Sequence, residues 1–273
     1  MQTKKSTLSI FILFLGYAFL YLPIAYLLFF SFNNSPIPGK WTGFTLKWYY
    51  DLFHNEALFK SFLTSLQIAT ISATCAVILG TIAAVAMTRF RKFKGKTFLS
   101  SLLPLPLIMP DVITGVALLL MFVTFERMIG IPSERGILTV SIAHITIGIA
   151  YVYMIVQSRL QYFDQSIEEA ALDLGAKPHV VFFKITLPII RISLLSGWLL
   201  AFALSLDDVV IASFLSGPGA TTLPMVLFSS LRLGVSPEIN ALAGVVILIV
   251  FLSVLLAGFF YYKAEENGKK EIL

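Results

Sequence analysis

The sequence predicts an all-α, polytopic membrane protein with six transmembrane helices. Of its 273 residues, 58% are hydrophobic and only 13% are charged, which is too apolar for a soluble domain. Six apolar runs are long enough for a helix to cross the hydrocarbon core, which takes about 20 residues. Backbone groups in lipid must be hydrogen-bonded within the protein, so runs of this length indicate helices rather than strands.

The predicted spans cover residues 8–32, 62–87, 98–125, 137–157, 192–215 and 241–262. No linker, internal repeat or second domain is evident, so the sequence predicts a single transmembrane domain over residues 1–273. The first run follows Lys4 and Lys5, as a secretory signal would. It is longer than the apolar core of a signal and has no clear small-residue cleavage site, so we interpret it as a retained span.

The basic residues indicate how the chain lies in the bilayer. The net charge of +5 comes from side chains at the ends of apolar runs, which favours a role in orientation over nucleic-acid binding. With the N-terminus inside, most of the 20 Lys and Arg residues fall in predicted cytoplasmic segments. Both termini are therefore expected in the cytoplasm, with outer loops at residues 33–55 and 216–240 and a long inner loop at residues 158–191.

No catalytic, metal or nucleotide site is predicted, and no cofactor is expected. His54, His144 and His179 are far apart in the sequence and lack metal-ligand spacing. The "GKT" at residues 95–97 resembles the end of a phosphate-binding loop, but Phe90 stands where that loop has its first glycine. His144 is the only histidine in a predicted span and has no evident partner, so an intramembrane enzyme is not expected.

The third span is irregular, because "LPLPLIMPD" places Pro104, Pro106 and Pro110 close together, directly before Asp111. Each proline removes a backbone donor and clashes with the preceding turn, so the helix is expected to break. Irregular backbone at membrane depth is tolerated where it is buried in protein or lines a water-filled cavity. The break is interpreted either as part of a transport pathway or as a structural kink.

Three acidic residues, Asp111, Asp207 and Asp208, lie inside predicted spans. A charge at the bilayer centre costs about 2.5–3.5 kcal/mol on insertion scales, so each carboxylate needs compensation. No Lys or Arg occurs at residues 98–125 or 192–231. Asp111 and Asp207 each lie about 20 Å from the cytoplasmic end of a span, so they are expected to face one cavity. A substrate with two ammonium groups would supply the missing positive charge.

Asp207 and Asp208 point about 100° apart on a helix, so one of them is expected to face the pathway. The other is expected to cap a broken helix or to bond a partner subunit. Ser205 is a candidate hydrogen-bonding neighbour. Trp48 and the aromatic residues near it are interpreted as an interfacial belt, or as a ring surface offered to a cationic ligand. A purely structural role for the three acids is the alternative.

The inner loop at residues 158–191 is expected to form two short helices. Ser166 and Glu169 have the spacing of a capping box. Gly175 is placed to end the first helix in a left-handed conformation, and Pro178 suits the first turn of the second. An apolar face consists of Ile167, Ala170, Ala171 and Leu174. We interpret the loop as a docking element for a soluble partner. A helix lying on the bilayer is the alternative, but its acidic residues suit an anionic leaflet poorly.

This loop also resembles a family motif. The residues that carry the resemblance are Glu169, Ala170, Ala171, Gly175, Leu187 and Pro188, and their spacing is that of the coupling loop of binding-protein-dependent ABC importer permeases. The stretches "MPDVITG" (109–115), "SIEEAALDLGA" (166–176) and "LSLDDVVIASF" (204–214) resemble the polyamine permeases. The chain is most similar to the C-type subunit of putrescine and spermidine importers.

The resemblance implies a type I ABC importer permease fold in the bacterial inner membrane. The implied partners are a second permease subunit in a heterodimer, two ATP-binding subunits that hydrolyse ATP, and a periplasmic polyamine-binding protein. The predicted substrate-binding residues are Asp111, Asp207, Asp208, Ser205 and Trp48, with putrescine expected before spermidine. The predicted ATPase-coupling residues are Ser166, Glu169, Ala170, Ala171, Gly175, Leu187 and Pro188.

A secondary transporter driven by an ion gradient, or a cation channel, is the rival interpretation. The same acids would then bind Na⁺ or H⁺, and the chain would transport without an ATPase. The ordered inner loop argues against this interpretation.

Overall fold

The computed structural model describes residues 7–37, 39–90, 92–233, 237–249, 251–252 and 255. Within these ranges the chain is helical apart from its loops, and the one β-type pairing described joins Asn33 and Phe44. The all-α prediction is therefore confirmed. The chain divides into two compact units, Met1–Leu58 with Ser229–Leu273 (unit 1) and Phe59–Phe228 (unit 2), and each is described by itself.

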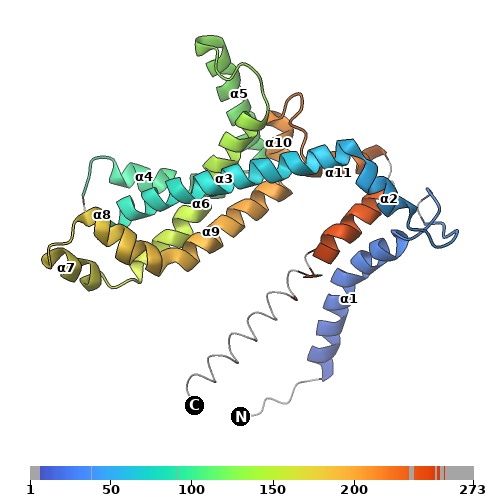
Figure 1. Ribbon diagram of the computed structural model, residues 1–273, viewed down its shortest axis with the longest axis horizontal. Coiled ribbons are helices and arrows are strands. Elements are labelled where there is room, and N and C mark those ends of the chain that lie inside the picture. Colours follow the sequence, from blue (N-terminus) through green and yellow to red (C-terminus); the bar gives the residue numbers. More distant parts are fainter. Residues whose placement is uncertain are drawn as a thin grey trace. The chain divides into compact units, whose positions relative to one another are not determined.

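The helices are labelled in Figure 1. In chain order they are α1 (Thr7–Phe30), α2 (Lys47–His54), α3 (Glu56–Arg89), α4 (Lys96–Leu102), the 3-10 helix η1 (Leu105–Leu107), α5 (Asp111–Ile129), α6 (Ile137–Gln161), α7 (Ser166–Asp173), α8 (Pro178–Val181), the π-helix η2 (Phe182–Thr186), α9 (Leu187–Asp207), α10 (Val210–Leu215) and α11 (Leu223–Leu233). A further apolar helix covers Pro237–Ile249.

Five helical stretches of the described chain are long and apolar enough to cross a membrane. They are Ile10–Phe30, Glu56–Arg89, Asp111–Ile129, Ile137–Gln161 and Pro178–Asp207. The sixth predicted span, 241–262, begins within Pro237–Ile249, and most of its later part lies outside the described residues. Lys4, Lys5 and the end of the chain from residue 256 also lie outside them, so the predicted cytoplasmic location of the termini stays a prediction.

Two of the predicted spans are divided. The third consists of α4, η1 and α5, and α5 begins at Asp111 directly after Pro110. This break lies in the proline-rich segment where the sequence predicts it. The fifth span is divided as well, because α9 ends at Asp207, Asp208 has an extended backbone, and α10 begins at Val210. No proline or glycine marks this second break.

The core of unit 2 is formed by α3, α6 and α9, which lie side by side (Figure 1). Small residues at their contacts let the backbones approach closely, as is typical of helices packed in lipid. A Cβ atom on Gly80 of α3 would lie 2.8 Å from the Cβ of Val152 on α6, and a Cβ on Gly148 would lie 2.8 Å from that of Ala76. Gly197 of α9 also packs against Val152.

A second cluster of buried side chains joins α3, α5, α6 and α10. Its members are Ile68, Phe122, Val140, Ala143, Ile211, Ala212 and Leu215. Gly115 of α5 packs against the ring of Phe214, to which a Cβ would come within 2.6 Å. This packing holds the start of α5 beside the break between α9 and α10, so the two interrupted spans meet.

In unit 1, the loop between α1 and α2 is organised around the buried side chain of Asn33. Its Oδ1 accepts hydrogen bonds from the backbone N–H groups of Ser35 and Thr42, and its Nδ2 donates to the carbonyl of Lys40. The indole N–H of Trp48 donates to the carbonyl of Asn33 at 2.7 Å. Trp48 therefore helps to close this loop.

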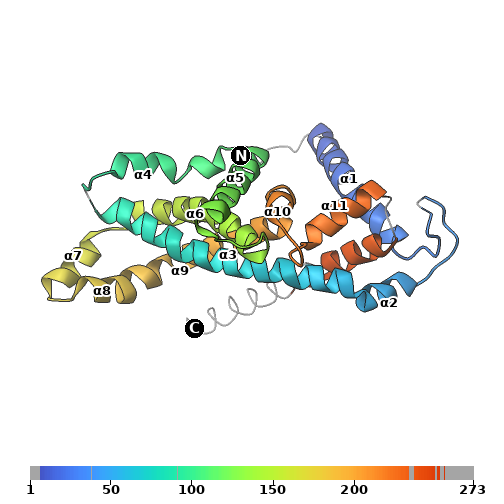
Figure 2. The same ribbon diagram turned by 90° about the horizontal axis from the view of Figure 1, so that it is seen from above.

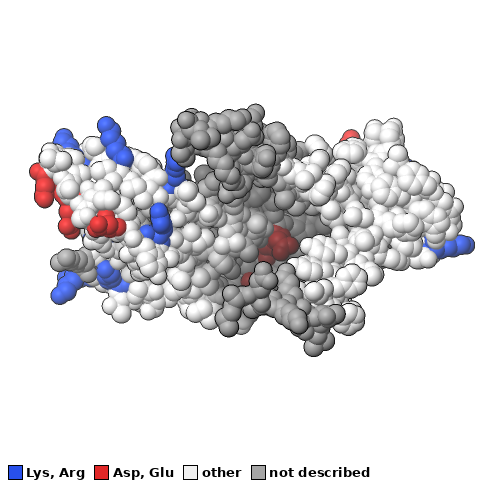
Figure 3. Space-filling model, turned by 90° about the horizontal axis from the view of Figure 1, so that it is seen from below, with Lys and Arg blue, Asp and Glu red and all other residues white. Residues whose placement is uncertain are grey.

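The inner loop projects from one end of unit 2. Figures 1 and 2 both show α7 and α8 beyond the ends of α6 and α9. In the space-filling view, basic and acidic side chains gather at this end (Figure 3). Charged groups suit a cytoplasmic surface, whereas the spans between the two membrane faces are largely free of them.

Candidate functional site

The two interrupted spans and α6 line an open cavity of about 370 Å³ in unit 2. Its walls come from the start of α5, one face of α6, the end of α9 and the start of α10. Four of the five predicted substrate residues line it, namely Asp111, Ser205, Asp207 and Asp208. No Lys or Arg is among the described residues that line it. In Figure 3, acidic atoms are visible in a recess, and the Lys and Arg side chains drawn in blue lie away from them.

Asp208 closes the break between α9 and α10. Its Oδ1 accepts a hydrogen bond from the N–H of Ile211 at 3.2 Å, and its Oδ2 accepts one from the N–H of Ala212 at 2.7 Å. The first N–H groups of a helix have no partner within the helix, and a carboxylate satisfies them well. Asp208 thus takes the capping role that the sequence left open for one of the two adjacent acids.

His144 links Asp208 to Ser205. Its Nδ1 lies 2.6 Å from the Oγ of Ser205, and its Nε2 lies 3.1 Å from the Oδ2 of Asp208. A ring protonated on Nε2 satisfies both contacts, because it donates to the carboxylate and accepts from the hydroxyl. The prediction that His144 has no partner is therefore wrong. Its partners lie 61 and 64 residues further along the chain, where no sequence spacing reveals them.

The Ser205–His144–Asp208 row contains the residue types of a hydrolase triad but not its arrangement. In such a triad the serine faces Nε2 and the aspartate faces Nδ1, whereas here the two are exchanged. Ser205 is buried, and Asp208 is already bonded to two backbone N–H groups. We interpret the row as a polar strut that fixes α6 to the break between α9 and α10.

Asp111 and Asp207 remain as the exposed carboxylates of the cavity. Neither has a hydrogen-bond or ion-pair partner within the described part of the chain. Asp111 is the first residue of α5, where the helix dipole favours a negative charge. Asp207 is the last residue of α9, where the dipole opposes one. The positive ends of the dipoles of α5 and α10 are thus compensated by the carboxylates of Asp111 and Asp208. The carboxylate of Asp207 instead adds to the negative end of the dipole of α9, and this negative potential is not compensated.

Tyr151, which is not among the residues predicted from the sequence, also lines the cavity. His144, Gly148 and Tyr151 recur on α6 at intervals of four and three residues, which places them on one helix face. That periodicity, together with the polar residues at two of its positions, is a signal that could have identified the wall of the cavity. A tyrosine ring and hydroxyl offer a cation both a π-face and an oxygen acceptor.

Trp48 is not among the residues that line the cavity. It lies in unit 1, where its indole N–H is bonded to Asn33. The Nζ of Lys47 lies 5.3 Å from the centre of its ring. The ring face already has a cationic neighbour, so nothing in the structure favours the ligand role that the sequence suggested for Trp48.

The inner loop forms the predicted helix, with a different start. The proposed capping box of Ser166 and Glu169 is wrong, because α7 begins at Ser166 and Gln165 is its N-cap, with no side-chain cap bond. Asp164 takes the role instead, since its Oδ1 accepts from the N–H of Ser166 at 3.0 Å. That hydrogen bond lowers the pKa of the Asp164 carboxyl below its ordinary value.

The end of α7 is the one the sequence predicts. Gly175 has a φ of +84° and its N–H donates to the carbonyl of Leu172. The N–H of Ala176 reaches back to the carbonyl of Ala171 at 3.0 Å, which completes a Schellman motif. Pro178 then occupies the first turn of α8. The chain therefore stops α7 sharply and turns back towards the membrane.

The predicted coupling residues lie on α7, at the turn that follows it and at the start of α9. Ser166, Glu169 and Ala170 are exposed on α7, Ala171 is half-buried, and Leu187 and Pro188 begin α9. Ile167 and Leu174, from the predicted apolar face, are also exposed, Leu174 to 90%. An exposed apolar surface at a membrane face is typical of a contact with another protein.

Known proteins resemble this chain over most of its length. The family model described as "Binding-protein-dependent transport system inner membrane component" matches residues 76–266. The putrescine transport system permease protein PotI of Escherichia coli (strain K12) is 50% identical over 268 residues, which cover 98% of this chain and 95% of the relative. The spermidine/putrescine transport system permease protein PotC of the same strain is 40% identical over 239 residues, 88% of either chain.

Solved structures share the fold. A chain of a bacterial ABC transporter involved in the import of the acidic polysaccharide alginate superposes with a TM-score of 0.71 at 14% identity, covering 94% of both chains. A chain of an amino acid ABC transporter gives a TM-score of 0.54 at 19% identity, covering 79% of this chain and 98% of the other. At such low identities the likeness bears on the fold alone.

Proposed function

The chain belongs to the family of binding-protein-dependent transport system inner membrane components, and on that premise we propose that it is the membrane-spanning permease subunit of an ATP-driven polyamine importer. It forms half of the translocation pathway. The cavity between the two interrupted spans is the part of that pathway that holds the substrate.

The observation that carries this proposal is the uncompensated negative charge of the cavity. Asp111 and Asp207 are exposed in it without a partner among the described residues, and no described basic residue lines it. Unpaired acids within a span are costly unless a cation joins them. A diamine in its doubly protonated form offers one ammonium group to each carboxylate, and each contact is a charge-assisted hydrogen bond.

Among polyamines, putrescine is the first choice and spermidine the second. The relative with 50% identity is named as a putrescine permease, and the relative with 40% identity as a spermidine/putrescine permease. The two free carboxylates suit a substrate with two terminal ammonium groups. Tyr151 supplies an aromatic face beside them.

The exposed surface of α7 is the docking element for an ATP-hydrolysing partner. Two ATP-binding subunits, a second permease subunit and a periplasmic polyamine-binding protein complete the importer. This chain contributes no nucleotide-binding motif, so ATP is hydrolysed by the partner. Closure of the ATP-binding subunits moves α7 and switches the spans between inward- and outward-facing states, with both termini of the chain in the cytoplasm.

The alternative, an ion-gradient-driven cation transporter or channel, would use the same acids. That alternative does not explain why an ordered helix ends in a Schellman motif and exposes apolar side chains at the membrane surface. It also predicts transport by this chain alone. Uptake by the chain reconstituted without ATP-binding subunits would establish that alternative.

The test of the proposed substrate site is uptake of labelled putrescine by the complete importer in proteoliposomes. Asp111→Asn and Asp207→Asn are each expected to raise the KM by about ten- to a hundredfold, which corresponds to the loss of one charge-assisted hydrogen bond. The control is Glu126→Gln, which removes an exposed carboxylate at the other end of α5. Normal uptake kinetics in the Asp111→Asn/Asp207→Asn double variant would remove the cavity from the pathway.

A further inference from the structure

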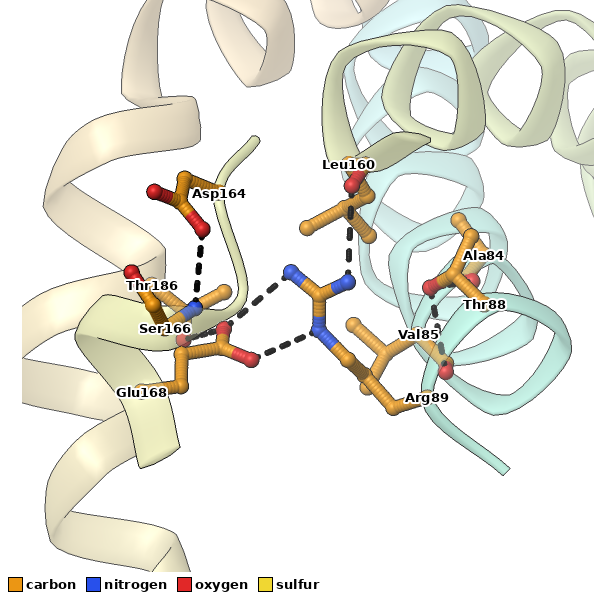
Figure 4. A network of polar contacts seen from close by, with 9 residues as sticks. All are labelled: Ala84, Val85, Thr88, Arg89, Leu160, Asp164, Ser166, Glu168 and Thr186. Atoms are coloured by element: carbon orange, nitrogen blue, oxygen red, sulfur yellow. Dashed lines mark hydrogen bonds and ion pairs between the residues drawn. The ribbon is translucent and has the colours of Figure 1, made fainter. Parts of the chain in front are cut away.

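Glu168 and Glu169 are neighbours on α7 with opposite surroundings. Glu169 is exposed and has no hydrogen-bond or ion-pair partner among the described residues. Glu168 turns towards the spans (Figure 4), where its Oε2 lies 2.7 Å from the Nε of Arg89 in an ion pair. The Nη2 of Arg89 donates to Oε1 at 3.2 Å, and the hydroxyl of Thr186 donates to the same oxygen at 2.5 Å.

These contacts join four helices at one point. Arg89 is the last residue of α3, and its Nη1 donates to the carbonyl of Leu160 near the end of α6, at 3.4 Å. Its guanidinium also lies over the ring of Phe163, 5.6 Å from the centre. Thr186 is the last residue of η2 and is 3% exposed. The Glu168 carboxylate therefore connects α7 directly to the end of α3 and to η2, and through Arg89 to the end of α6.

Little else fixes α7 to those spans. No residue of α7 is fully buried. Within the described chain, the side-chain hydrogen bonds and the ion pair between α7 and other helices all involve Glu168. The side chains of Arg89 and Glu168 are only 16% and 13% exposed, so solvent screens this pair less than a fully exposed one.

Thr186, whose hydroxyl donates to Glu168, is the last residue of the π-helix η2. A π-helical turn inside an α-helical run is rare in proteins, and those that occur are often found at functional sites. Directly after η2, α9 runs without interruption over 21 residues from Leu187 to Asp207, a length of about 30 Å. One end of α9 is thus held to α7 through Thr186, and the other end carries the unpaired carboxylate of the cavity.

We propose that Glu168 is the positioning residue that clasps α7 to α3 and to the start of α9, so that a displacement of α7 reaches both spans at once. This rests on the docking role proposed for α7. Glu168 and Glu169 then have different roles. Glu169 faces the ATP-hydrolysing partner, and Glu168 transmits the movement of α7 to α3 and α9. Loss of the clasp leaves α7 bound to its partner but free to move without the spans.

The test uses the complete importer in proteoliposomes, with Glu168→Gln, Arg89→Gln and Thr186→Val. We expect each complex to retain its ATP-binding subunits, while the amount of putrescine taken up per ATP hydrolysed falls by about tenfold for the two charge variants and less for Thr186→Val. Exchanging the charges in Arg89→Glu/Glu168→Arg should restore part of that ratio. The control is Glu126→Gln, which makes the same chemical change at an exposed carboxylate of α5, outside the docking surface, and should leave the ratio unchanged.

Hydrogen exchange of the α7 backbone provides a second measurement that needs no substrate. Glu168→Gln and Arg89→Gln should both speed exchange over residues 166–173, and Glu126→Gln should not. If the importer does not transport putrescine, the substrate proposal fails while the exchange result still decides on the clasp. Unchanged exchange together with an unchanged ratio in Glu168→Gln, or an equal effect of Glu126→Gln, would overturn the clasp.

Discussion

Asp207 and Asp208 are adjacent in the chain but have opposite roles in the structure. Asp208 accepts hydrogen bonds from the N–H groups of Ile211 and Ala212 and lies 3.1 Å from the Nε2 of His144. Asp207 is exposed in the cavity and has no such partner within the described residues. The change of backbone direction between α9 and α10 separates them, since Asp207 ends a helix and Asp208 caps the next one.

The first prediction is that asparagine has different effects at these two positions. Asp208→Asn weakens the cap and the contact to His144, so the thermal unfolding of the purified complex should occur at a lower temperature, with a loss of about 1–2 kcal/mol. Asp207→Asn removes an unpaired charge from the end of a helix, so stability should be unchanged or slightly higher. Equal losses of stability in the two variants would show that the difference in their surroundings has no energetic consequence.

The second prediction concerns the strut between α6 and α9. Ser205→Ala leaves the Nδ1 of His144 without its partner in a buried place, which should cost about 1–3 kcal/mol. Thr146→Ala, on the exposed face of α6, is the matched control and should be close to neutral. Thermal unfolding in detergent measures both. If Ser205→Ala and His144→Asn also prove neutral, the row does not hold the break in place.

The third prediction concerns the end of α7. Gly175→Ala places a Cβ on a residue with a φ of +84°, which should cost about 1–2 kcal/mol and loosen the Schellman motif. We expect less ATP-binding subunit to co-purify with the variant. Gly16→Ala in α1, a helical position with open space around it, should have no effect. If Gly175→Ala retains the ATP-binding subunits fully, docking does not depend on the geometry of this turn.

The sequence predicted the features that depend on local chemistry. Apolar runs and prolines indicated long apolar helices and the break before Asp111, and Gly175 and Pro178 indicated the turn after α7. These features arise from the residues at the position itself. The family resemblance extended the prediction to the fold, which the comparisons confirm.

The features that depend on packing were not predictable in the same way. His144 is bonded to residues 61 and 64 positions away, and Arg89 pairs with Glu168 across 79 positions. The break after Asp207 contains no proline or glycine, and only the presence of two adjacent acids indicated a cap. The capping box at Ser166 failed because Asp164, two residues earlier, supplies the acceptor.

The central claim is that unpaired carboxylates in the cavity between the interrupted spans bind the ammonium groups of a polyamine. The most direct measurement is an experimental structure of the complete importer trapped with putrescine between its open states. We predict an ammonium nitrogen about 2.7–2.9 Å from a carboxylate oxygen of Asp207 or Asp111. The claim is contradicted if putrescine binds elsewhere and both carboxylates are satisfied by side chains of the second permease subunit.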